Sequence, residues 1–222
     1  MALDSSTVYR LLSTLRAHGY AKQGSGDKRY DLGPKALELG QKALRKYGLR
    51  ELGASFMREL STSAGVTAQL TSFVGGKATI VDKWEGPGVL TVAPRIGSEA
   101  WLWCTASGKT IAACLSEEDL GEVLGRTGMR RFTDKTITDL GVLRDHLRKV
   151  REQGYAVSDQ EVEAGFRALA APVFDSRAVA GAIGVLGTAS SLPVEREGEI
   201  AQLVMDAARR LSQALGHEES AR

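Results

Sequence analysis

The 222-residue sequence predicts an α+β protein built from two parts, a small basic N-terminal segment and a larger domain of helices and strands. Apolar residues recur at helical spacing near the start, alternate with polar residues from Val66 onward, and return to helical spacing at the end. Residues 1–48 hold nine Lys and Arg against four Asp and Glu, whereas residues 49–222 hold twenty against twenty-three. A basic segment before an acidic domain is typical of a nucleic-acid contact joined to a separate domain, although a solvated basic face has the same composition.

The first predicted element is a helix that Asp4, Ser5 or Ser6 can cap and that Gly19 ends. Its apolar stripe consists of residues at helical spacing, namely Val8, Leu11, Leu12 and Leu15. Its other face carries hydroxyl and guanidinium groups, which bond phosphates and base edges, at Ser6, Tyr9, Arg10, Ser13 and Arg16. A solvated helix face explains the same pattern when this segment is taken alone.

The next residues favour the DNA-binding interpretation. Residues 20–23 and 29–32 are strand-like and flank a turn of hairpin composition at residues 24–27, with Lys28 and Arg29 beside it. A two-sided helix followed directly by a basic hairpin is the second half of a winged helix-turn-helix. In that arrangement the helix enters the major groove and the wing holds the DNA backbone. We therefore expect residues 1–33 to form a partial winged helix-turn-helix.

A linker helix and a larger domain are predicted to follow. Pro34 stands at a favoured first-turn position and Gly48 breaks the helix, so residues 34–48 are the predicted linker and residues 49–222 the second domain. Helices are expected at 49–63, 105–115, 117–124 (capped by Ser116), from a cap at Thr138 to Gly154, and at 193–215. Strands are expected at 66–74, 78–84, 89–94, 166–174 and 179–186. Such elements around one sheet make an α+β domain.

No pattern typical of an enzyme or a metal site stands out. Gly108-Lys109-Thr110 lacks the earlier glycine of a phosphate-binding loop, because Trp103 occupies that position, and the three histidines lie on separate predicted helices. Cys104 near a helix start is more often a packed residue than a nucleophile. We expect no catalytic residue, no cofactor and no metal. Neither a signal peptide nor a membrane span is apparent, so a cytoplasmic location is expected.

Several ordered motifs resemble the IclR family of bacterial transcription regulators. Residues 5–12 are similar to that family's recognition helix, residues 30–33 to the exit of its wing, and residues 104–109 to the start of an effector-domain helix. Residues 154–156, Glu161 and residues 170–175 resemble its later strand and turn motifs. The resemblance implies that Thr7 belongs to the DNA-contacting helix. It also implies a GAF-like antiparallel-sheet effector domain, assembly as homodimers or tetramers, and binding to double-stranded operator DNA.

The same resemblance implies an effector pocket lined by small, apolar and hydroxyl-bearing residues: Ala100, Ala106, Ser107, Ser158, Phe166, Ala168, Gly184 and Leu186. In relatives that bind small carboxylic acids, four matching positions tend to offer one acidic group, one thiol group and two hydroxyl groups. Here Ser158, Ala168, Gly184 and Leu186 stand there, so we expect an effector with one polar or acidic end and an apolar ring or chain. Trp101 and Trp103 are expected beside the pocket, in the core, or at a subunit contact.

The functional hypothesis is a DNA-binding regulator controlled by a small organic effector. One departure from the family bears on it: about two helices precede the recognition helix in the family, whereas four residues precede it here. The apolar stripe of the first helix is therefore expected to lack most of its packing partners. Either the start codon is assigned too late or the chain is a truncated regulator. The alternative is a ligand-binding, oligomerising module that has lost DNA binding, and an unrecognised enzyme is the third hypothesis.

Overall fold

The computed structural model describes residues 4–24, 29–39, 48–87 and 95–218. The chain divides into two compact units, Met1–Gly48 and Leu49–Arg222. Among the described residues, none of the helices has both the length and the apolar character that crossing a membrane requires.

The first unit holds a capped helix and a two-stranded hairpin. Helix α1 (Ser5–Ala17) begins where the Asp4 carboxylate accepts the Ser6 backbone N–H at 2.7 Å. It ends at His18, and Gly19 follows in the left-handed conformation. Strands β1 (Ala21–Gln23) and β2 (Tyr30–Leu32) pair antiparallel, and residues 34–39 are helical. The hairpin between the two strands is as predicted, while the turn residues 25–28 and most of the predicted linker, residues 40–47, lie outside the described residues.

The apolar stripe of α1 is largely open to solvent. Val8 is 38 % exposed, Leu11 53 % and Leu15 45 %, and no residue of α1 is buried. The expectation that this stripe lacks packing partners is therefore confirmed for the described residues of the unit.

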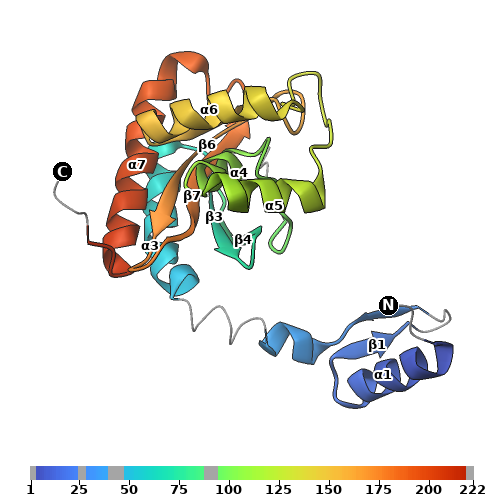
Figure 1. Ribbon diagram of the computed structural model, residues 1–222. Coiled ribbons are helices and arrows are strands. Elements are labelled where there is room, and N and C mark those ends of the chain that lie inside the picture. Colours follow the sequence, from blue (N-terminus) through green and yellow to red (C-terminus); the bar gives the residue numbers. More distant parts are fainter. Residues whose placement is uncertain (1–3, 25–28, 40–47, 88–94, 219–222) are drawn as a thin grey trace. The chain divides into compact units, whose positions relative to one another are not determined.

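The second unit is built on one antiparallel sheet of five strands in the order β4-β3-β7-β6-β5 (Figure 1). These strands are β3 (Thr67–Val74), β4 (Lys77–Trp84), β5 (Ala156–Asp159), β6 (Phe166–Phe174) and β7 (Val179–Thr188). The helices are α3 (Leu49–Ala64), α4 (Ala106–Ala112), α5 (Glu117–Thr127), α6 (Leu140–Gln153) and α7 (Glu197–Ala214), with a 3₁₀ turn η1 (Val194–Arg196) before α7. The fold is thus a mixed helix and antiparallel-sheet fold, as the sequence predicted.

Helices cover both faces of this sheet. A Cβ on Gly53 of α3 would lie 2.5 Å from the Leu70 side chain of β3, whereas the neighbouring Gln69 bonds to Ser107 of α4. Because successive strand residues point to opposite faces, α3 and α4 lie on opposite sides of β3. Helix α7 packs beside α3, and α5 and α6 lie outside α4, as Figure 1 shows.

Two details differ from the sequence-based expectations, and a third expectation is not tested by the described residues. The cap of α6 is Asp139, whose Oδ1 accepts the Val142 N–H at 2.9 Å, and not Thr138; a carboxylate and a hydroxyl in adjacent positions are equally plausible caps from sequence alone. The short strand β5 was not predicted, because its four residues are too few to show an alternating pattern. The expected strand at 89–94 falls outside the described residues.

Candidate functional site

A cavity of about 330 Å³ lies on the α4 face of the sheet. Its walls come from residues 98–101, the start of α4, the β5–β6 loop, and the residues of β3, β6 and β7 that point to this face. Six of the eight effector-pocket residues expected from the sequence line it together: Ala100, Ala106, Ser158, Phe166, Ala168 and Leu186. Residues from four separate parts of the chain thus converge on one mainly apolar space.

The other two expected residues lie behind the wall. Ser107 is fully buried, and its hydroxyl accepts a hydrogen bond from the Gln69 amide at 3.1 Å. Gly184 sits in β7 between Gln69 of β3 and Ala170 of β6. A Cβ at position 184 would lie 2.4 Å from the Leu169 carbonyl oxygen, so the close approach of the two strands requires glycine there.

Gln69 is one of several lining residues that the sequence analysis missed, and it is the side-chain amide among those described. Its side chain is almost buried, at 7 % exposed, and it points into the cavity from the middle of an apolar strand. A polar residue at an inward-facing position of residues 66–74 was the available signal, since buried amides keep a hydrogen-bond partner or a function. Trp101 also lines the cavity and stacks on Phe132, with ring centroids 4.3 Å apart. Trp103 is a core residue instead, and its indole N–H donates to the Arg130 carbonyl at 3.0 Å.

Three hydroxyl groups line the cavity, and that of Ser98 donates to the Arg95 carbonyl at 2.7 Å. The other two also donate their protons. Ser158 Oγ donates to the Cys104 carbonyl oxygen at 2.7 Å. Thr105 Oγ1 donates to the Trp101 carbonyl at 2.9 Å and accepts the Gly108 N–H at 2.9 Å, which caps α4. Both oxygens can still accept a hydrogen bond, but neither has a proton left to donate.

The charges of the lining residues are predominantly acidic. Glu99 lies 3.7 Å from Lys77, and Glu163 at the rim forms no ion pair with the described residues. Arg167 is the one lining residue with a positive charge among those described, and its guanidinium points away, bonding the Leu192 carbonyl and the Glu197 carboxylate beside α7.

A buried ion pair supports one wall of the cavity. Lys109 Nζ of α4 bonds Glu161 in the β5–β6 loop; the Lys109 side chain is fully buried and that of Glu161 is 9 % exposed. The nearby Cys104 thiol is also buried, and this burial raises the pKa of Cys104 to about 12, so the thiol is protonated at neutral pH. No three His, Cys, Asp or Glu side chains of the described residues are placed to hold a metal ion.

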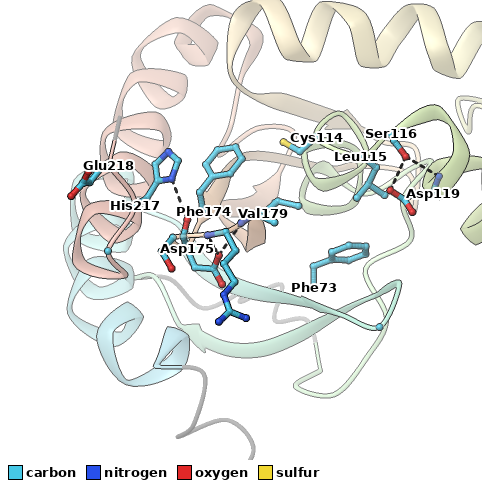
Figure 2. Close-up of a pocket in the computed structure, with 15 residues that line it drawn as sticks. Phe73, Cys114, Leu115, Ser116, Asp119, Phe174, Asp175, Val179, His217 and Glu218 are labelled. Carbon is cyan, nitrogen blue, oxygen red and sulfur yellow. Dashed lines mark hydrogen bonds between the residues drawn. The ribbon is translucent and has the colours of Figure 1, made fainter. Parts of the chain in front are cut away.

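A second, wider hollow of about 1050 Å³ contains none of the predicted residues (Figure 2). It lies between the β3–β4 turn, the start of α5, the β6–β7 turn and the residues after α7. Its polar groups serve the local turns: Ser116 caps α5 through the Asp119 N–H, and the Asp175 carboxylate accepts two backbone N–H groups of its own turn. His217 stacks on Phe174 and bonds the Asp175 carbonyl. The more apolar cavity beside Gln69 is therefore the better candidate for binding a small molecule.

The predicted DNA-contacting residues lie on α1 and the hairpin. Ser6, Tyr9, Arg10 and Arg16 are exposed, and Ser13 is half-buried. Arg16 donates to the Gln23 side chain of β1 at 3.0 Å, which ties the helix to the hairpin. The Thr7 hydroxyl donates to Asp4 at 2.8 Å and so belongs to the helix cap. The Arg29 side chain is exposed, whereas Lys28 lies outside the described residues.

Comparison with known proteins gives a consistent picture. The model of the family described as "Bacterial transcriptional regulator IclR C-terminal" matches residues 41–213. The HTH-type transcriptional repressor AllR of Salmonella typhi is 31 % identical over 215 residues, which cover 96 % of this chain and 79 % of that protein. The HTH-type transcriptional regulator KdgR of Escherichia coli is 32 % identical, over 98 % of this chain and 83 % of that protein.

Solved structures agree with the sequence relatives. A putative IclR transcriptional regulator from a Silicibacter species superimposes with a TM-score of 0.86 at 29 % identity, covering 97 % of this chain and 85 % of that one. The IclR protein of Thermotoga maritima superimposes with a TM-score of 0.77 at 30 % identity, covering 97 % and 87 %.

Proposed function

Because the chain belongs to the IclR family of bacterial transcriptional regulators, we propose that it is a cytoplasmic, DNA-binding transcription regulator that a small organic effector controls. The observation that carries this proposal is the family match over residues 41–213, joined to a capped helix with an exposed polar face. In this proposal residues 1–33 are the second half of a winged helix-turn-helix and residues 49–222 bind the effector.

The N-terminal unit has the features that DNA contact requires. Tyr9 and Arg10 project from the exposed face of α1, where side chains of a recognition helix reach base edges. The β1–β2 hairpin follows directly, and the bond from Arg16 to Gln23 fixes the helix against it. Such a helix and wing recognise a half-site, so we propose binding to a pseudo-palindromic duplex by a homodimer or tetramer.

The effector cavity and the N-terminal unit are connected through the chain. Gln69 faces the cavity while the next residue, Leu70, packs under Gly53 of α3, and α3 begins immediately after Gly48. An effector changes DNA affinity only if it binds the two arrangements of the protein unequally. We propose that residues 34–48 change the orientation of the DNA-binding segments, residues 1–33, when the effector binds. Two glycines inserted after Leu39 should then abolish the effector-induced change in DNA affinity while each site still binds.

Selection of duplexes from randomised DNA, followed by fluorescence anisotropy, tests the DNA-binding proposal. We expect Arg10→Ala to cost about 1–3 kcal/mol and to relax sequence preference, as loss of a base-edge contact does. Lys28→Ala should weaken binding equally on all sequences and flatten its salt dependence. Arg148→Ala, an exposed arginine of α6, is the matched control and should change neither. Absence of binding to any duplex would contradict the proposal and favour the ligand-binding, oligomerising module.

A further inference from the structure

We infer that the cavity beside Gln69 selects an uncharged hydrogen-bonding head group, such as a carboxamide, over a carboxylate, and that Gln69 is the residue that determines this specificity. The inference rests on the proposed function, because it names the chemical class of the effector for the same cavity. Of the polar or acidic end that the sequence suggested, it keeps the uncharged polar kind, and it follows from the charges and hydrogen bonds of the lining residues.

A carboxylate finds no available cation in this cavity. Arg167 is the cationic lining residue among those described, and its guanidinium is bound by Glu197 and the Leu192 carbonyl, with its Nε 3.7 Å from Asp159. The lining also includes Glu99 and Glu163, both acidic. Residues 88–94, which precede the wall at 98–101, contain neither lysine nor arginine, and the Arg95 that follows them is exposed and does not line the cavity. An ionised carboxylate that leaves water without a cation forfeits much of its hydration, so the missing cation disfavours it here.

The hydroxyl groups do not compensate for the missing cation. Ser158 Oγ and Thr105 Oγ1 donate their protons to the Cys104 and Trp101 carbonyls, respectively. A ligand carboxylate offers only hydrogen-bond acceptors. It would therefore place its oxygens against the two hydroxyl oxygens, which can only accept. A ligand N–H or O–H, in contrast, can donate to either of them.

Gln69 supplies the one amide group that both donates and accepts. Its Nε2 donates to Ser107 Oγ, and its Oε1 has no hydrogen-bond partner among the described residues although the side chain is only 7 % exposed. Amide nitrogen carries two protons, so Gln69 retains one N–H and one carbonyl oxygen for a ligand. A carboxamide is the direct complement of that pair, and a hydroxyl group matches either half.

The rest of the cavity fits an apolar body. Ala100, Ala106, Phe166, Ala168 and Leu186 form walls that reward burial of hydrocarbon, and the volume of about 330 Å³ accommodates a ring or short chain. Size and apolar character therefore set affinity for the body of the ligand, while Gln69 discriminates among head groups.

Titration calorimetry of the full chain at pH 7 with matched pairs tests this inference. The probes are benzamide against benzoate, phenylacetamide against phenylacetate, and hexanamide against hexanoate. We expect the better-binding amides to bind at least about tenfold more tightly than their acids. Gln69→Leu should weaken amide binding about tenfold and leave acid binding unchanged, while Gln202→Leu, the same replacement on the exposed face of α7, should change neither.

A second variant guards against a folding defect. The double change Gln69→Leu with Ser107→Ala removes both hydrogen-bond partners together, so no buried hydroxyl is left unpaired. It should reproduce the loss of amide selectivity with an unchanged unfolding midpoint. Acids that bind as tightly as their amides, no binding by any amide, or selectivity that survives both Gln69 variants would overturn the inference. Loss of DNA binding with intact amide selectivity would instead contradict only the proposed regulator function.

Discussion

Removal of one partner of the buried Lys109–Glu161 ion pair should destabilise the second unit more than any surface charge change. The Lys109 side chain is fully buried, and Glu161 keeps only 9 % of its side chain exposed. Glu161 Oε2 is buried and has no hydrogen-bond partner among the described residues, so the pairing of this carboxylate with Lys109 is the main compensation for its burial. Burial raises the pKa of Glu161 and lowers that of Lys109, because it removes water from both charged groups.

The magnitude follows from what each variant leaves behind. Glu161→Leu strands a buried ammonium, and Lys109→Met strands a buried carboxylate, so each should cost about 3–5 kcal/mol of unfolding free energy. That is a large part of the roughly 5–15 kcal/mol by which domains are stable. Lys109→Met combined with Glu161→Leu leaves no charge and should lie within about 1 kcal/mol of the native chain or exceed it.

Urea denaturation followed by tryptophan fluorescence measures these changes in the relevant unit, because Trp84, Trp101 and Trp103 all lie in residues 49–222. The matched control is Lys135→Met, which breaks the exposed pair with Asp159, where N and O are 2.7 Å apart. Its cost should be about 0–1 kcal/mol. The reasoning would be refuted if Lys109→Met lost no more unfolding free energy than Lys135→Met. It would also be refuted if the double variant were as unstable as the less stable of the two single variants.

Three further predictions concern the same unit. Gly53→Ala should destabilise the second unit by about 1–3 kcal/mol through overpacking, because the added Cβ would lie 2.5 Å from the Leu70 side chain of β3. Gly121→Ala, where nothing lies within 4 Å of the added Cβ in α5, should instead stabilise it by about 0.5–1 kcal/mol. The midpoints of urea denaturation compare the two variants. Asp139→Ala should lower the free energy of unfolding by about 1 kcal/mol, because it removes the cap of α6, and Thr138→Ala should lower it much less. Equal losses would contradict the assignment of Asp139 as the cap. Burial lowers the pKa of His146 to about 4 from 6.5, so stability present above pH 6.5 should be lost as pH falls toward 4, because the unfolded chain binds the proton first. In His146→Leu this loss between pH 6.5 and 4 should disappear, and persistence of the full loss would assign it to another group.

Periodicity predicted the parts of the fold that are buried over most of their length. The apolar stripes of α3 and α6 contact the core, and the largely apolar residues of β6 and β7 are buried in the middle of the sheet, so the pattern fixes both type and extent. Resemblance then placed six pocket residues on one cavity wall, although their role in binding stays a prediction. Where the pattern was short, as in β5 or at the α6 cap, type or boundary was missed.

The head-group chemistry of the cavity could not be predicted, because it depends on strands that are distant in the chain. Gln69 of β3 faces the cavity between β4 and β7, and β7 follows it by more than a hundred residues, so its bond to Ser107 exists only in the assembled sheet. Arg167 shows the same dependence, since its position in β6 directs the guanidinium to Glu197 and away from the cavity where Ala168 lies. A sequence reports that an arginine and several hydroxyl groups are near the pocket. The strand register and the hydrogen-bond partners, which the sequence does not contain, determine that the Arg167 cation is paired and that the hydroxyl protons are donated within the protein. On our inference, the Gln69 amide then remains to recognise a ligand.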